Sequence, residues 1–360
     1  MLCLQEENIG RPLCFTVGIL LGLAARDAQI WLVGTTLGFL LLYTNSSWKK
    51  GLKKEKFFLF CVFATGLLCG LLAEEGTRLG HWARAEAWAD HLRSYIRSLP
   101  YRDSTTNELL CALLTGDRSG LPHELKNAFR QSGASHLLAL SGMHIGILYL
   151  GFSWVLRWAG NAPFWKKTRS VLLIMLCGVY TLAVGAGASI VRAWLFIVLR
   201  ETALILERKV RPSDILAGAL ILQEAMDPTA VREIGFQLSY LAMTGIVFLY
   251  PKLQKLWPEE EGFSGISRRS NGLLSIGLHK VWDISALSIS CQVFTGPLAW
   301  WKFGSFPLFF LLTNLLCMPL MTLVMAGALV ALTTRIPLLL TVNETCCRTL
   351  IFTLETIASL

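Results

Sequence analysis

The chain has 360 residues, of which 54% are hydrophobic and 16% are charged, and its mean hydropathy is +0.53. A water-soluble fold of this length cannot bury so much apolar surface, so the composition excludes an ordinary soluble globular protein. The formal net charge is +9, but membrane proteins carry excess Lys and Arg on their cytoplasmic loops, so basicity alone does not indicate a nucleic-acid partner. We therefore expect the lipid bilayer to be the main solvent of this chain.

Apolar runs of about 20 residues, the length that crosses a bilayer as a helix, recur along the sequence. The first run follows Glu6 and Glu7 and leads directly into a second, which predicts a retained span rather than a cleaved signal peptide. The fold class is therefore predicted to be an all-α polytopic membrane protein with about ten transmembrane helices, some of them interrupted. The predicted spans lie near residues 12–25, 29–44, 57–73, 136–156, 170–187, 190–206, 213–226, 234–250, 284–302 and 306–333.

The chain divides into four predicted segments. Apolar residues at helical spacing over 81–99 predict an amphipathic helix on the membrane surface. A second helix is expected to end at Gly116, and a third to begin at Pro122 and to end before Gly133. The four segments are a transmembrane hairpin with a third span at 1–73, an extracytoplasmic helical segment at 74–135, the main transmembrane domain at 136–335, and an amphipathic or broken helix at 336–360.

Lys and Arg gather in the loops on one side of the predicted spans. Because the asymmetry of Lys and Arg between short loops sets the orientation of a membrane protein, these loops are expected to be cytoplasmic. The protein is thus predicted to cross the membrane several times with its basic loops inside the cell. The basic loops are 46–56, 166–169, 208–211, 252–280 and the residue Arg335.

The ten cysteines do not indicate a metal centre. No Cys-x-x-Cys pair occurs, and residues such as Cys61, Cys177 and Cys317 lie inside apolar runs, as small core residues do. No nucleotide-binding loop of the Gly-x-x-x-x-Gly-Lys type occurs either. We therefore predict no metal and no cofactor, and we do not expect the chain to supply its own energy.

A first polar group lies at the start of the span predicted at 136–156, where His136, Ser141 and His144 fall among apolar residues. Polar side chains are costly in lipid and usually face a protein interior or a cavity. Hydrogen bonding between helices is one interpretation. A serine hydrolase with a histidine base is another, although no third group and no oxyanion hole are evident. His136 and His144 have no third ligand at a spacing that suits a metal ion.

Two further groups interrupt later spans. Glycines break the apolar stretch at 184–193, and Arg192 follows them, so free backbone amides beside an arginine would suit an anion such as phosphate. A tight hairpin with Arg192 reaching to the membrane surface is the alternative. Gln237 and Asn314 lie in later spans, where they either line a pore or hydrogen-bond a neighbouring helix.

At these residues the sequence resembles the competence domain of ComEC proteins. The resemblance depends on an ordered set of short blocks rather than on any single one, and it covers roughly residues 105–335. The blocks are 114–119, 129–144, 189–193, 235–239, 295–297, 303–307 and 314–319.

The resemblance implies a channel in the bacterial inner membrane that passes one strand of incoming DNA during transformation. Such a channel needs arginines that neutralise phosphates and a polar interior. We expect Arg192 to contact phosphate and Arg118 and Arg130 to line the outer mouth. The inner wall is expected to include His136, Ser141, His144, Gln237 and Asn314.

The chain also departs from the family pattern. The interval at 74–106 is too short for the outer oligonucleotide-binding barrel that members commonly carry. No histidine and aspartate cluster of the metallo-β-lactamase-like C-terminal domain is found, so we expect neither nuclease nor other enzymatic activity. The implied partners are single-stranded DNA, the lipid bilayer, a separate cytoplasmic motor, a DNA receptor and a second copy of the chain. A small-solute transporter and a non-functional remnant remain alternative functions.

Overall fold

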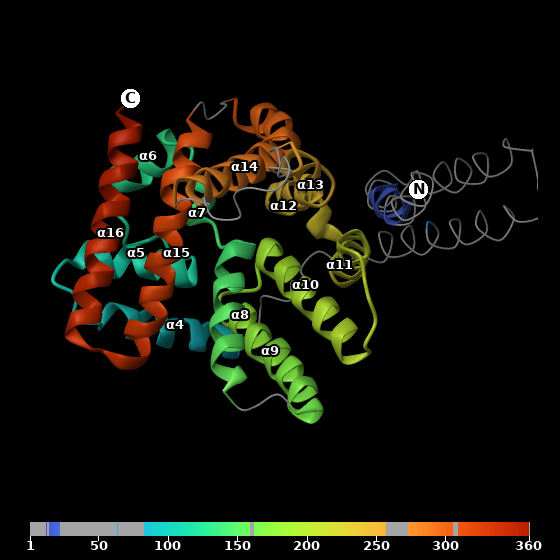
Figure 1. Ribbon diagram of the computed structural model, residues 1–360, viewed down its shortest axis with the longest axis horizontal. Coiled ribbons are helices and arrows are strands. Elements are labelled where there is room, and N and C mark those ends of the chain that lie inside the picture. Colours follow the sequence, from blue (N-terminus) through green and yellow to red (C-terminus); the bar gives the residue numbers. More distant parts are fainter. Residues whose placement is uncertain are drawn as a thin grey trace, which may run out of the picture. The chain divides into compact units, whose positions relative to one another are not determined.

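The structure is a computed structural model (Figure 1). Within the residues that it describes, every regular element is a helix, which confirms the all-α class. The spans predicted at 29–44 and 57–73 and the basic loop 46–56 lie outside the described residues, apart from residue 63. The described residues are 12, 14–21, 63, 83–158, 162–256, 273–304 and 309–359.

The chain forms two compact units. The first consists of Met1–His81, Asn161–Met175 and Val191–Gln237, and the second of Trp82–Gly160, Leu176–Ile190 and Leu238–Leu360. Each unit is therefore built from segments that lie far apart in the sequence, and helices α9 and α10 contribute residues to both. The boundary predicted at residue 135 does not separate compact units.

The second unit contains most of the helices. They are α4 (Ala83–Arg97), α5 (Ser104–Thr115), α6 (His123–Gln131), α7 (Ser135–Leu138), α8 (Gly142–Arg157), α12 (Ile234–Thr244), the π-helix η2 (Gly245–Leu249), α13 (Tyr250–Gln254), α14 (Leu273–Phe303), α15 (Phe310–Thr334) and α16 (Pro337–Ala358). The first unit holds a helical stretch at 14–21, the greater part of α10 (Ala188–Ile205), the first part of α9 (Pro163–Ala183), α11 (Pro212–Met226), the 3-10 helix η1 (Pro228–Arg232) and the start of α12.

Each span predicted between residues 136 and 333 falls on continuous helical structure, which α12, η2 and α13 form together over 234–254. The span predicted at 136–156 is the exception, because it breaks after Leu138 and resumes as α8 at Gly142. Helices α9 and α14 begin well before the predicted starts at 170 and 284. In the part of the chain that the structure describes, two helical segments are long and apolar enough to cross a membrane, namely Ile234–Gln254 and Phe310–Thr334.

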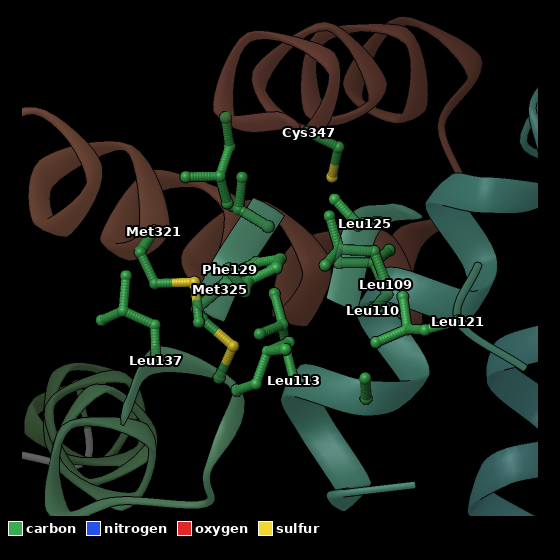
Figure 2. Packing of buried hydrophobic residues seen from close by; sticks show 14 of the residues in the cluster. Leu109, Leu110, Leu113, Leu121, Leu125, Phe129, Leu137, Met321, Met325 and Cys347 are labelled. Atoms are coloured by element: carbon green, nitrogen blue, oxygen red, sulfur yellow. The ribbon is translucent and has the colours of Figure 1, made fainter. Parts of the chain in front are cut away.

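The core of the second unit lies between α5 and the pair formed by α15 and α16, which run side by side (Figure 1). Helix α5 is buried over most of its surface, and α6 and α7 close the core from the same side as α5. Figure 2 shows the side chains that meet there, which are Leu109, Leu110, Leu113, Leu121, Leu125, Phe129, Leu137, Met321, Met325 and Cys347. This packing joins α5 and α6 to α15 and α16 through close van der Waals contact.

Residues 83–135 lie along the length of α15. Near one end of α15, the Tyr95 hydroxyl donates to the Leu332 carbonyl oxygen at 2.7 Å. Near the other end, the Thr313 hydroxyl donates to the Ser132 carbonyl oxygen at 2.6 Å. These two contacts are about 28 Å apart along the helix at 1.5 Å per residue. The predicted extracytoplasmic segment therefore shares one core with helices that were assigned to the membrane.

Arg335 does not fit the predicted orientation. Its guanidinium carbon lies 4.7 Å from the centroid of the Tyr95 ring, and its Nε donates to the Tyr95 hydroxyl at 3.3 Å. Arg335 was expected on the side of the membrane opposite to 74–135, so this expectation is wrong. The rule that Lys and Arg gather on the cytoplasmic side applies to whole loops. The position of the single residue Arg335 is set instead by its stacking on the Tyr95 ring.

The last helix, α16, is one unbroken helix from Pro337 to Ala358. Two of the residues that suggested a break, Asn343 and Glu344, are buried and have hydrogen-bond partners in the protein. Asn343 Nδ2 donates to the Tyr101 hydroxyl at 2.8 Å, and Arg348 Nη2 donates to Glu344 Oε1 at 2.6 Å. Buried polar groups with partners do not interrupt a helix, so the polar face of α16 docks on the segment before α5.

The amphipathic helix predicted at 81–99 is α4, but it packs on α5 rather than lying alone. Ala89, Ile96 and Leu99 are buried, whereas Tyr95, which the predicted apolar face included, is 37% exposed. The side-chain amide of Asn107 on α5 closes the end of this helix. It donates to the carbonyl oxygens of Ile96 at 3.2 Å, Arg97 at 3.0 Å and Leu99 at 2.9 Å.

Replacing Asn107 by alanine should lower the free energy of unfolding by about 1–3 kcal/mol, because buried carbonyl oxygens lose their donor. Thermal unfolding of the purified protein in detergent measures this change. Asn127 on α6 is exposed, so Asn127→Ala is the matched control. Equal melting temperatures for the two variants would contradict the role assigned to Asn107.

Candidate nucleic-acid interface

Arg118 connects two parts of the second unit that are separate in sequence. It lies in the turn between α5 and α6, and its Nε donates to the carbonyl oxygen of Leu138 at 3.2 Å. Leu138 ends α7, where carbonyl groups have no partner within the helix. The guanidinium thereby fastens the α5–α6 turn to the break between α7 and α8, while the rest of the side chain is exposed.

The backbone brings this turn close to the break. Gly116 ends α5 with a φ of 77°, a left-handed conformation that suits glycine. A Cβ at Gly116 would meet the side chain of Leu140 at 2.8 Å, so the turn packs directly on the break. The Tyr180 hydroxyl also donates to the Leu114 carbonyl oxygen at 2.7 Å and holds the end of α5.

The charge of Arg118 is not neutralised by its neighbour Asp117. The Asp117 carboxylate accepts from Arg97 Nη2 at 3.2 Å and lies 3.8 Å from Arg93 Nε. Its other oxygen accepts the backbone N–H of Ser119 at 3.0 Å. Hydrogen bonds from Ser119, together with the two arginines, lower the pKa of the Asp117 carboxyl, so the group stays ionised. The acid next to Arg118 is thus engaged elsewhere, which leaves positive charge at the turn.

Ser141 and His144 form the N-terminal cap of α8. Ser141 Oγ accepts from the backbone N–H of Met143 at 3.3 Å, and His144 Nδ1 accepts from the backbone N–H of Ser141 at 3.2 Å. This reciprocal pattern is a capping box. Ser141 Oγ also lies 3.0 Å from His144 Nδ1. These contacts are made within one turn, whereas hydrogen bonds between helices were expected.

His136 and Asn314 connect the break to two further helices. His136 Nδ1 lies 3.2 Å from the Gly133 carbonyl oxygen, and its ring lies near the side chain of Asn314 on α15. Asn314 Nδ2 donates in turn to the Ser288 hydroxyl on α14 at 3.2 Å. His136 is exposed and Asn314 is half-buried. Of its two predicted roles, Asn314 therefore shows the hydrogen bond to a neighbouring helix.

The structure thus gathers five of the eight predicted residues in one region of the second unit, which we call the Arg118 site. Arg130 lies in the last turn of α6, exposed, just before the segment that leads to this site. Sequence reasoning missed the Asp117 pairing and the Thr313 bond to Ser132, because both depend on contacts between distant segments. The Arg118 site consists of Arg118, His136, Ser141, His144 and Asn314.

Arg192 and Gln237 belong to the first unit. Arg192 is buried on α10 and is 6% exposed. Gln237 Nε2 donates to the Val231 carbonyl oxygen at the end of η1 at 2.9 Å. Arg192 is thus buried, whereas Arg118 and Arg130 are the predicted arginines that are exposed.

The glycine break before Arg192 is a tight turn. Gly185 and Ala186 have φ values of 87° and 47°. The backbone N–H of Ala186 donates to the Thr181 carbonyl oxygen at 2.9 Å, and that of Gly185 donates to Leu182 at 3.1 Å. These two amides close the end of α9. The expectation that amides at this break are free for an anion is therefore wrong for Gly185 and Ala186.

The Arg118 site presents polar side chains of several kinds. It offers an exposed guanidinium, an exposed imidazole and an amide, which together suit phosphate and base edges. Across the described ranges from residue 83 to 359, no three His, Cys, Asp or Glu side chains are placed to hold a metal ion.

Comparison with known proteins gives a consistent assignment. Residues 113–360 match the family described as Competence protein. The chain is 27% identical over 208 residues to ComE operon protein 3 of Bacillus subtilis (strain 168), which covers 58% of this chain and 26% of that protein. It is 26% identical over 149 residues to the uncharacterized protein YcaI of Escherichia coli (strain K12), which covers 40% of this chain and 20% of that protein. These matches span about a quarter or less of each relative's length. No solved structure matches.

Proposed function

The chain belongs to the competence protein family, and on that premise we propose that it lines a passage for single-stranded DNA through the bacterial plasma membrane. The observation that carries the proposal is the Arg118 site. Arg118 is exposed, its acidic neighbour is paired with Arg93 and Arg97, and it lies inside the stretch that matches the family. Phosphate neutralisation by arginine is the main source of affinity for a DNA strand.

The break between α7 and α8 supports a role in strand passage. Irregular backbone at membrane depth is tolerated where it is covered by protein or lines a watery cavity. At this break, Arg118 donates a hydrogen bond to the Leu138 carbonyl oxygen, while Ser141 and His144 cap the N-terminus of α8. A polar break next to exposed Arg118 and His136 would suit a hydrated strand.

We also propose that the protein is multi-pass with about ten spans. Two described helices meet the length and hydropathy of a span, and α9 exposes large apolar side chains that would face lipid, among them Met175 at 63% and Val179 at 48%. The basic loops 166–169 and 208–211 are proposed to be cytoplasmic. The ion pair between Lys167 and Glu207, 3.5 Å apart, supports their placement on one side.

The partners follow from the same proposal. The motor that draws the strand inward and the receptor that captures it outside would be separate proteins, since the sequence shows no nucleotide-binding loop. A homodimer would enclose the strand between two copies of the Arg118 site. A decayed remnant or a small-solute transporter predicts no dependence of DNA uptake on this chain.

Uptake of labelled DNA into the cytoplasm tests the proposal. A strain with the gene deleted is compared with the same strain after the gene is restored, with the amount of protein in the membrane measured by immunoblot. Loss of uptake on deletion and its recovery on restoration are expected. Uptake that is unchanged by deletion, with the protein present in the parent membrane, would favour another solute or a remnant.

A further inference from the structure

Glu224 is a fully buried acid in the first unit. It lies near the end of α11, and its exposed fraction is 0%. Burying an ionised carboxylate costs several kcal/mol unless a cation or several hydrogen-bond donors compensate the charge. The partners of Glu224 therefore decide whether the group carries a charge or a proton.

The single hydrogen-bond partner of the Glu224 side chain among the described residues is Thr16, on the helical stretch at 14–21. The Thr16 hydroxyl oxygen lies 2.9 Å from Oε1 and 3.1 Å from Oε2 of Glu224. The same oxygen lies 2.9 Å from the carbonyl oxygen of Pro12, four residues earlier. One hydroxyl hydrogen is thus placed between three acceptor oxygens.

The Thr16 hydroxyl can donate its hydrogen either to Glu224, which then accepts a single hydrogen bond, or to the Pro12 carbonyl oxygen. Threonines elsewhere in the protein, such as Thr181 and Thr244, donate their hydrogen to the carbonyl four residues earlier. If Thr16 does the same toward Pro12, its oxygen remains as an acceptor, and Glu224 must supply the hydrogen between the two side chains. A protonated carboxyl can do so, whereas a carboxylate cannot.

The charged groups around Glu224 do not offer a counter-ion. Helix α10 touches α11 where Leu199 approaches Gly218, and α10 carries Arg192, Arg200 and Glu201. Cys14 is the titratable side chain in the described part of 12–21, and Asp227, Arg232 and Glu233 follow α11. Within the described residues, no Lys, Arg or His nitrogen forms an ion pair with Glu224.

We propose that Glu224 is a proton-binding site, protonated in this conformation, which releases its proton only when α11 and the 14–21 helix separate. On release, the carboxyl O–H bond breaks, the proton passes to water and the carboxylate keeps the electron pair. In the closed contact the resulting charge would be buried with Thr16 as its donor and without a cation, which is costly. Proton release therefore favours separation of the two helices. This site lies in the first unit and does not depend on the DNA passage.

Infrared spectroscopy of the full-length protein in lipid nanodiscs tests the proposal. A protonated carboxyl gives a carbonyl stretch at higher frequency than the carboxylate bands, and this stretch shifts in heavy water. We expect such a band at neutral pH and its loss in Glu224→Gln. Thr16→Val keeps the side-chain shape but removes the acceptor, so it should move the band to higher frequency. Glu207→Gln is the control, because Glu207 is exposed, and it should leave the band unchanged.

Thermal unfolding against pH gives an independent measurement. The folded protein holds a proton that the unfolded chain has lost at neutral pH, so wild-type stability should fall as the pH rises. Glu224→Gln should remove this part of the dependence, while Glu207→Gln should retain it. A folded wild-type protein without the Glu224-dependent band, or one whose stability follows the same pH curve as Glu224→Gln, would overturn the proposal whether or not the protein transports DNA.

Discussion

Replacing Arg118 by alanine should lower DNA uptake about tenfold or more, while the protein remains folded in the membrane. Among the described residues, the side chain makes one hydrogen bond, to the Leu138 carbonyl oxygen, and Arg118 is exposed. A hydrogen bond from a charged group contributes about 1.5–3 kcal/mol, and 1.4 kcal/mol corresponds to a tenfold change in an equilibrium constant. Loss of both the fastening of the break and the phosphate contact should therefore reduce uptake strongly.

Lysine is the informative replacement at this position. Arg118→Lys keeps the positive charge but cannot present a fork that binds Leu138 and a phosphate together, so uptake should recover only in part. Arg157, an exposed arginine in the last turn of α8, is the matched control, and Arg157→Ala should leave uptake near the wild-type level. If Arg118→Ala and Arg157→Ala take up DNA equally well, Arg118 does not contact the strand.

Replacing Gly245 by alanine should destabilise the second unit by about 3 kcal/mol. Gly245 begins the π-helix η2 and faces the backbone carbonyl of Ser290 on α14, so closely that a Cβ would overlap it. Backbone atoms cannot rotate away as a side chain can, so α12 and α14 would have to move apart. Less protein in the membrane and a lower melting temperature in detergent are the expected observations.

Gly146 on α8 provides the comparison for Gly245. Among the described residues, nothing lies within 4 Å of a Cβ built at Gly146. Gly146→Ala should therefore be neutral or slightly stabilising, because alanine is the better helix former. Equal stability of the two variants would show that the close approach of η2 to α14 is not present in the membrane.

Local signals in the sequence predicted the helix boundaries well. Gly116 was expected to end a helix, and it does so in a left-handed conformation. Pro122 was expected to open the next helix, and α6 begins one residue later. Both helix ends depend on the backbone preferences of single residues, which act within one turn, so the residue type alone predicts them.

Contacts between distant segments could not be predicted in this way. The polar residues of α16 suggested a break because their partners, Tyr101 and the 102–103 segment, lie about 240 residues earlier. The stacking of Arg335 on Tyr95 is hidden for the same reason. From the sequence alone, a charged or amide side chain is expected to be exposed, because its hydrogen-bond partner in the folded protein is not known.

The candidate site shows the same division. The sequence identified Arg118, His136, Ser141, His144 and Asn314, but it ranked Arg192 first because glycines precede it. The burial of Arg192 and the backbone hydrogen bonds that close the turn at 184–187 depend on the folded structure and cannot be inferred from the residue types alone. The capping box of Ser141 and His144 was visible in the spacing, since a serine followed three residues later by a hydrogen-bonding side chain is typical of a helix start.

The most direct test of the central claim is whether incoming DNA touches the Arg118 site. A photo-crosslinking amino acid at Ser135, which is exposed beside His136, is activated during uptake of a labelled strand. The same amino acid at Glu207, exposed in the first unit, is the control. We expect labelled DNA attached to the protein at position 135 and none at position 207. Uptake that continues with no DNA attached at position 135 would contradict passage of the strand along this site.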